Sequence, residues 1–177
     1  MDFSNFKTSD WLMVGGGAAM LVLGFVLDWT TVSAFGESAG GDGPFNYFLT
    51  GGIAWILVVA VGVLAFLRAG GRLPESQPWG IIFLLAAGLA TLLMIIQIIL
   101  GGRDLGFGVN GDRGIGMWGA LIWSAISVAG AFMGFQAAGG DIKDLTNMDK
   151  MKQSFSGSDG GGDTPPPPPP AAPSSDS

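Results

Sequence analysis

The side chains of this sequence that could do chemistry are carboxylates and hydroxyls, because the chain contains neither histidine nor cysteine. That absence removes imidazole general bases, thiol nucleophiles and thiolate–zinc sites. The remaining route to catalysis is a divalent metal ion held outside the apolar stretches by Asp28, Glu37, Asp42 and Asp112. These carboxylates are scattered without a recognisable spacing. We therefore predict no catalytic residue, no metal site and no cofactor, and we do not expect an enzyme.

Two further patterns bear on nucleotides and nucleic acids. Residues 106–111 match G-x-G-x-x-G, but a dinucleotide site needs that motif between a strand and a helix, and here it lies between two apolar stretches. The net charge of −6 is opposite to the basic surface that phosphate backbones require. We predict a turn at 106–111 and no nucleic-acid partner.

Hydrophobic residues make up 49% of the 177 residues and charged residues only 12%, about half the usual share for a soluble domain. Four stretches are long enough to cross about 30 Å of hydrocarbon, and they are about 11–28, 47–67, 79–100 and 115–138. Their apolar cores contain no charged residue and no proline. The sequence predicts an all-α integral membrane protein, a four-transmembrane-helix bundle spanning residues 11–138.

Prolines, glycines and tryptophans agree with these boundaries. Prolines fall between the stretches, and glycine pairs follow the second, third and fourth, where a left-handed turn can end a helix. Tryptophans at the ends of the stretches are typical of an aromatic belt at the membrane surface; they are Trp11, Trp29, Trp79 and Trp118.

Basic residues predict the orientation. With the N-terminus in the cytoplasm, the inner side holds Lys7, Arg68, Arg72, Lys143, Lys150 and Lys152, and the outer side holds Arg103 and Arg113. Positive charge favours the cytoplasmic side. We predict a multi-pass protein of the cell (plasma) membrane with both termini in the cytoplasm.

Small residues on the first and last stretches predict where helices pack closely, since lipid tails provide no hydrophobic drive between helices. The candidates are Gly15, Ala19, Gly116, Ala120, Ser124, Gly130, Gly134 and Ala138. These faces pack either inside one bundle or, for the last stretch, between two copies in a homo-oligomer. The polar positions within the stretches are Thr91, Gln97, Ser124 and Ser127, and of these Gln97 is the one whose buried amide needs partners.

The outer loops carry charges that can fasten them together. The first is acidic, and the hypothesis is that a basic residue of the second pairs with it; the alternative is that the charges are solvated separately. The residues concerned are Asp28, Glu37, Asp42, Arg103 and Arg113.

The flanking segments differ from the bundle. Residues 1–10 are expected to form a cytoplasmic foot at the membrane surface, and 139–155 an amphipathic juxtamembrane helix. Residues 156–177 lack large apolar side chains, which predicts a disordered tail. Within it, Pro165–Pro170 predicts a stiff polyproline rod that is either a ligand for a protein partner or a spacer.

Several segments resemble uncharacterised small four-span membrane proteins of actinobacteria. They are Asp28–Trp29, 44–52, 101–118 and 137–152, and the resemblance covers about residues 8–155. It implies a cell-membrane location and brings no functional residue with it.

We therefore expect a structural or scaffolding protein, an accessory subunit of a membrane complex. The alternative is an oligomeric channel or passive-transport component lined by the polar positions named above. A membrane enzyme is the reading that the residues support least.

Overall fold

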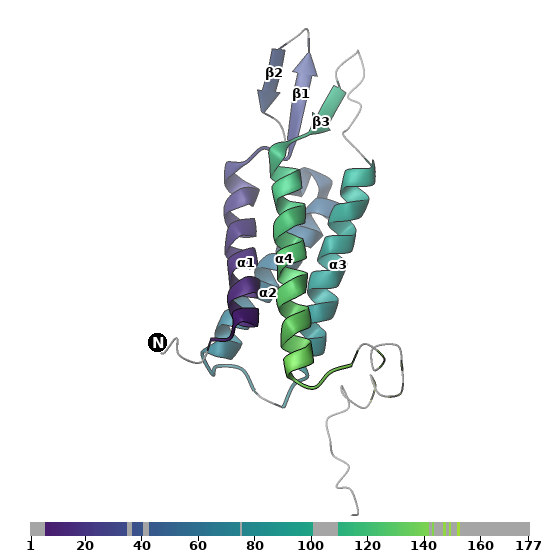
Figure 1. Ribbon diagram of the computed structural model, residues 1–177. Helices are drawn as coiled ribbons and strands as arrows, with labels where there is room; N and C mark the ends of the chain where they lie inside the picture. Colours follow the sequence, from purple (N-terminus) through teal and green to yellow (C-terminus); the bar gives the residue numbers. More distant parts are fainter. Residues whose placement is uncertain are drawn as a thin grey trace, which may run out of the picture.

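The computed structural model describes residues 6–34, 37–40, 43–74, 76–100 and 110–141, together with residues 143, 147, 149 and 152. The described chain is mostly helical. Its four long helices are α1 (Thr8–Val26), α2 (Ile53–Ala69), α3 (Trp79–Leu100) and α4 (Ile115–Ala137). They form an up-and-down bundle in which each helix packs on the next and α4 packs back on α1 (Figure 1). With α2 counted from Pro44, all four are long and apolar enough to cross a membrane.

The helix ends follow local sequence. The helix α3 begins directly after Pro78, and α1 begins at Thr8, where the backbone N–H of Lys7 donates to the Asp10 carboxylate at 3.0 Å. The second apolar stretch starts irregularly, with a 3₁₀ turn η1 (Pro44–Tyr47) and a π-helical turn η2 (Phe48–Gly52) before α2. Regular α-helix therefore starts at Ile53, later than the predicted residue 47.

Left-handed glycines end α2 and α4, as the glycine pairs predict. Gly71 has φ +67° and Gly139 has φ +82°. After α2 the Arg72 N–H bonds the Leu67 carbonyl at 2.9 Å, and after α4 the Gly140 N–H bonds the Phe135 carbonyl at 3.1 Å. Both are Schellman caps, which satisfy the last carbonyls of a helix.

A three-stranded antiparallel sheet, which we did not expect, stands at one end of the bundle. Its strands are β1 (Thr30–Ala34), β2 (Glu37–Gly40) and β3 (Asn110–Arg113), in the order β2-β1-β3. The sheet extends beyond the ends of α1 and α4 (Figure 1). The first described residues and the end of α4 both lie at the opposite end of the bundle (Figure 1). The fold is thus mostly, but not entirely, helical.

Candidate functional site

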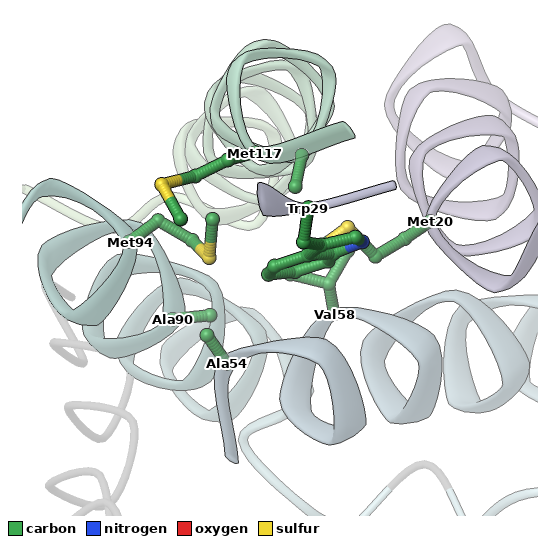
Figure 2. Close-up of a cluster of buried hydrophobic side chains, with 8 residues drawn as sticks. Met20, Trp29, Ala54, Val58, Ala90, Met94 and Met117 are labelled. Atoms are coloured by element: carbon green, nitrogen blue, oxygen red, sulfur yellow. The ribbon is translucent and has the colours of Figure 1, made fainter. Parts of the chain in front are cut away.

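Trp29 closes the end of the bundle that carries the sheet. Its side chain is fully buried and lies in a cluster to which all four helices contribute, with Met20, Val58, Met94 and Met117 among its members (Figure 2). The indole Nε1 donates to the Leu23 carbonyl at 3.3 Å, which gives the buried N–H its partner. The expectation that Trp29 lies in an aromatic belt was therefore wrong.

Two glycines make room for this indole. A Cβ on Gly116 would lie 3.0 Å from Cδ1 of Trp29, and a Cβ on Gly51 would lie 3.4 Å from Cζ3. Gly116 lies in the first turn of α4 and Gly51 belongs to η2, so the buried indole of Trp29 contacts the starts of the second and fourth apolar segments. Trp11 and Trp118, in contrast, are 52% and 48% exposed.

Backbone hydrogen bonds join the segment that follows α1 to the segment that precedes α4. Thr30 of β1 pairs with Arg113 of β3, and Thr31 pairs with Asp112. Below the sheet, the Gly114 N–H bonds the Trp29 carbonyl at 2.9 Å and the Gly116 N–H bonds the Asp28 carbonyl at 3.1 Å. These backbone bonds hold the end of α1 and the start of α4 together.

The predicted ion pairs of the outer loops stay a prediction. Arg103, Asp42 and the side chain of Glu37 lie outside the residues that the structure describes. Arg113 is exposed, and its Nε donates to the Ile98 carbonyl near the end of α3 at 2.8 Å. In the described part of the chain, no three acidic side chains come close enough together to hold a metal ion.

The polar side chains of the apolar segments lie inside the bundle. Gln97 is 2% exposed and accepts a hydrogen bond from the Thr50 hydroxyl of η2, which links that turn to α3. Ser124 donates to the carbonyl of Leu121 in its own helix at 2.8 Å. Among the described residues, the buried hydroxyls of Thr91 and Ser127 have no hydrogen-bond partner.

The close helix contacts of α1 fall on glycines next to the expected one. A Cβ at Gly15 would meet no atom within 4 Å, whereas a Cβ at Gly16 would overlap Oγ of Ser127 on α4. A Cβ at Gly17 would lie 2.8 Å from the Cα of Gly62 on α2. The crossings of α1 with α4 and α2 therefore use Gly16 and Gly17 and leave Gly15 open.

The small-residue face of α4 packs within the chain. A Cβ at Gly130 would lie 2.8 Å from Cβ of Leu12, and one at Gly134 would lie 3.6 Å from Cβ of Ser9. Ala120 and Ser124 are fully buried. Ala19 is partly buried and Ala138 is exposed. Gly130 and Gly134 of the predicted face thus pack on α1 of the same chain, and Gly116 packs on the residues that follow α1.

The flanking segments are described only in part. The ring of Phe6 lies 5.2 Å from that of Trp11 and 5.8 Å from that of Phe66, measured between centroids, so the residues before α1 pack on the bundle. Most of the predicted helix at 139–155 and all of the tail at 156–177, with Pro165–Pro170, lie outside the described residues.

Comparison of the chain with protein-family models, with curated proteins and with solved structures gave no match. The resemblance to four-span actinobacterial proteins accordingly stays a prediction. The class that the fold defines is a mostly helical chain with four helices long and apolar enough to cross a membrane.

Proposed function

We propose that the protein is an integral membrane protein of the cell membrane that serves as a structural or accessory subunit of a membrane complex. The observation that carries the membrane part is the outward surface of the bundle. All four helices expose large apolar side chains, and they include Val22, Phe25, Val63, Leu85, Leu92, Ile99, Ile122 and Met133. A soluble monomer rarely exposes so extensive an apolar surface, whereas lipid tails are its natural solvent.

Basic residues support an orientation with the sheet outside the cell and both chain ends in the cytoplasm. Lys7 precedes α1 and Arg68 and Arg72 stand at the end of α2, and these helix ends lie opposite the sheet. Lys143 and Lys152 come after α4 in the sequence, and the end of α4 lies opposite the sheet as well. Arg113 belongs to the sheet itself. An excess of Lys and Arg at one end is the pattern of a cytoplasmic face.

The interior of the bundle supports a structural rather than a transport role. Its helices cross through backbone contacts at glycines, and Trp29 fills one end. Asp10 is the one buried ionisable side chain in the described residues, and it caps its own helix. Coupled carriers usually hold ionisable groups near the membrane centre, where they relay protons or ions.

The same geometry gives less support to an oligomeric channel. A pore between copies needs polar side chains on the outer surface of the bundle. Gln97, Ser124 and Ser127 instead lie buried inside the chain, where they contact its own helices and turns.

Cysteine accessibility tests the proposed orientation. Because the chain has no cysteine, Ser38→Cys in β2 and Ser76→Cys in the loop between α2 and α3 each introduce a single thiol. On intact cells, a membrane-impermeant maleimide should label the first variant and not the second, and lysis should make both reactive. The opposite pattern refutes the orientation, and extraction of the protein by alkaline carbonate refutes the membrane location.

Purification from native membranes in a mild neutral detergent tests the accessory role. We expect the full chain to elute with other membrane proteins in a fixed stoichiometry, measured by light scattering and quantitative mass spectrometry. A version ending at Ser156, and one with Pro165–Pro170 replaced by a Gly-Ser segment of equal length, show whether the tail holds the partner. A chain that purifies alone and conducts ions when reconstituted supports the channel and refutes the accessory role.

A further inference from the structure

The end of the bundle opposite the sheet contains a pocket that no part of the proposed function uses. It has a volume of about 320 Å³ and lies at the hairpin between α2 and α3. Its walls are formed by Arg68, Gly71, Leu73, Pro74, Gln77 and Trp79. This volume is at the lower end of the roughly 300–1,000 Å³ typical of pockets for small ligands.

Arg68 supplies the positive charge of this pocket. Its guanidinium carbon lies 5.9 Å from the centroid of the Phe83 ring, and the side chain is partly buried. Within the described chain the guanidinium makes no hydrogen bond and no ion pair, so its N–H donors are available. An anionic ligand in the pocket would accept charge-assisted hydrogen bonds from this guanidinium, which are about twice as strong as those between neutral groups.

The surrounding backbone does not compete for the guanidinium. The carbonyls of Phe66, Leu67 and Arg68 at the end of α2 already accept hydrogen bonds from Gly70, Arg72 and Gly71. This cap holds the last turn of α2, from which the Arg68 side chain extends. The left-handed Gly71, with φ +67°, turns the chain from the end of the helix into the pocket wall.

The other wall is the start of α3, which is the positive end of that helix. Trp79 is its first residue, and the indole Nε1 donates to the Pro74 carbonyl at 2.8 Å, which holds the ring against the loop. The ring also stacks at a tilt on Phe83, with 5.7 Å between centroids. The exposed amide of Gln77 is a further donor at the rim.

We propose that this pocket binds a phosphate-type anion, supplied by the headgroup of an anionic lipid in the inner leaflet. The planar fork of Arg matches two phosphate oxygens, and Trp79 beside it is a residue that favours the headgroup level. Basic pockets between membrane helices on the cytoplasmic side are suited to such headgroups. The lipid source rests on the proposed membrane location and orientation, while phosphate binding itself does not.

The test compares Arg68→Gln with Arg72→Gln in the full chain. Both variants remove one positive charge from the same hairpin, but Arg72 is exposed and does not line the pocket. Native mass spectrometry from neutral detergent measures binding of phosphatidylglycerol, which is net anionic, and of phosphatidylcholine, which is not. We expect Arg68→Gln to weaken phosphatidylglycerol binding about tenfold or more, since hydrogen bonds to a charged group are lost. Arg72→Gln should leave it within about twofold, as expected of an exposed charge.

Inorganic phosphate distinguishes the two sources of the anion. Protection against thermal unfolding by millimolar phosphate, lost in Arg68→Gln and kept in Arg72→Gln, supports a phosphate site and can be measured even if the protein fails to enter bilayers. Phosphatidylglycerol binding that depends on Arg68 and that phosphate does not displace assigns the site to lipid. If Arg68→Gln folds poorly, Arg68→Lys keeps the charge without the fork and should show an intermediate loss. Equal binding by the Arg68 and Arg72 variants in both assays overturns the proposal.

Discussion

The helix α1 contains three consecutive glycines, Gly15, Gly16 and Gly17. Replacing each of them by alanine adds the same methyl group in three different surroundings. At Gly15 an added Cβ has no atom within 4 Å. At Gly16 it overlaps the Ser127 hydroxyl of α4. At Gly17 it lies 2.8 Å from the Cα of Gly62 and 3.2 Å from the Val58 carbonyl oxygen, both of which are backbone atoms of α2.

The expected magnitudes follow from these surroundings. Alanine is favoured over glycine inside a helix by about 1 kcal/mol, and this gain is shared by all three positions, so it cancels when the variants are compared. At Gly17 the helices must separate by several tenths of an ångström to reach a normal contact of about 3.5 Å, and overpacking of this kind costs about 1–3 kcal/mol. Gly15→Ala should match or exceed the wild type in stability, and Gly17→Ala should be about 1–3 kcal/mol less stable than Gly15→Ala.

Gly16→Ala should show an intermediate loss that a second substitution relieves. The clashing atom there belongs to a side chain, and among the described residues this hydroxyl has no hydrogen-bond partner. Ser127→Ala therefore removes the obstacle at little cost. The double variant Gly16→Ala with Ser127→Ala should recover part of the loss, and the remainder reflects the Trp123 carbonyl oxygen at 3.2 Å and the Cβ of residue 127 at 3.3 Å.

Thermal unfolding in one neutral detergent, followed by the loss of helical circular dichroism, measures this series. Gly88→Ala in α3 is a second control, because an added Cβ there also meets no atom within 4 Å. Equal melting temperatures for Gly15→Ala and Gly17→Ala would show that α1 and α2 do not cross at Gly17 and Gly62.

Four further substitutions probe the sheet end of the bundle. Trp29→Ala should lower the unfolding free energy by about 3–5 kcal/mol through the cavity it leaves, and a loss below about 1 kcal/mol would contradict the buried position of the indole. Thr50→Val and Gln97→Leu, made singly and together, should show a coupling of about 0.6–1.7 kcal/mol in a double-mutant cycle, whereas additive effects would exclude their hydrogen bond. Arg113→Gln should cost about 1 kcal/mol equally at 0.1 and about 1 M salt if the bond to the Ile98 carbonyl carries the effect, and a loss that high salt abolishes would instead indicate pairing with the acidic first loop.

The sequence predicted the helices better than it predicted their surroundings. Segment 79–100 coincides with α3, because Pro78 stops the preceding turn and the apolar run continues without interruption. The left-handed glycines after α2 and α4 were also predictable, since few other residues adopt positive φ. These features depend on neighbours in the chain, and a local pattern is enough to find them.

The pairing of β3 with β1 could not be predicted because the two strands lie far apart in the sequence. Strand β3 begins with Asn-Gly-Asp, which is typical of a turn, and it becomes a strand only through β1, far earlier in the chain. The β-branched residues Thr30, Thr31 and Val32 were the one available signal for β1.

For Trp29 and Gly15, too, the sequence alone does not show which other segment each residue contacts. A tryptophan after an apolar stretch has the same sequence signature at a membrane surface and in a buried plug. Three adjacent glycines likewise do not reveal which of them meets another helix, because that depends on the rotation of α1 within the bundle. Residues 66–71 and 135–140 share the pattern Phe-x-x-Ala-Gly-Gly, yet the left-handed glycine is the second of the pair at Gly71 and the first at Gly139.

The glycine crossings and the pocket at the α2–α3 hairpin should therefore respond to different changes. Gly17 sets the distance between α1 and α2 through backbone contacts, and it does not line the pocket. Arg68 lines the pocket and contacts the Phe83 ring. If the pocket at the α2–α3 hairpin binds phosphate independently of the helix crossings, Gly17→Ala should lower the melting temperature without changing the affinity for phosphatidylglycerol. Arg68→Gln should change that affinity, and the two effects should add in the double variant, as they do for separate sites. A loss of lipid affinity in Gly17→Ala would instead mean that the pocket forms only when the helix crossings are intact.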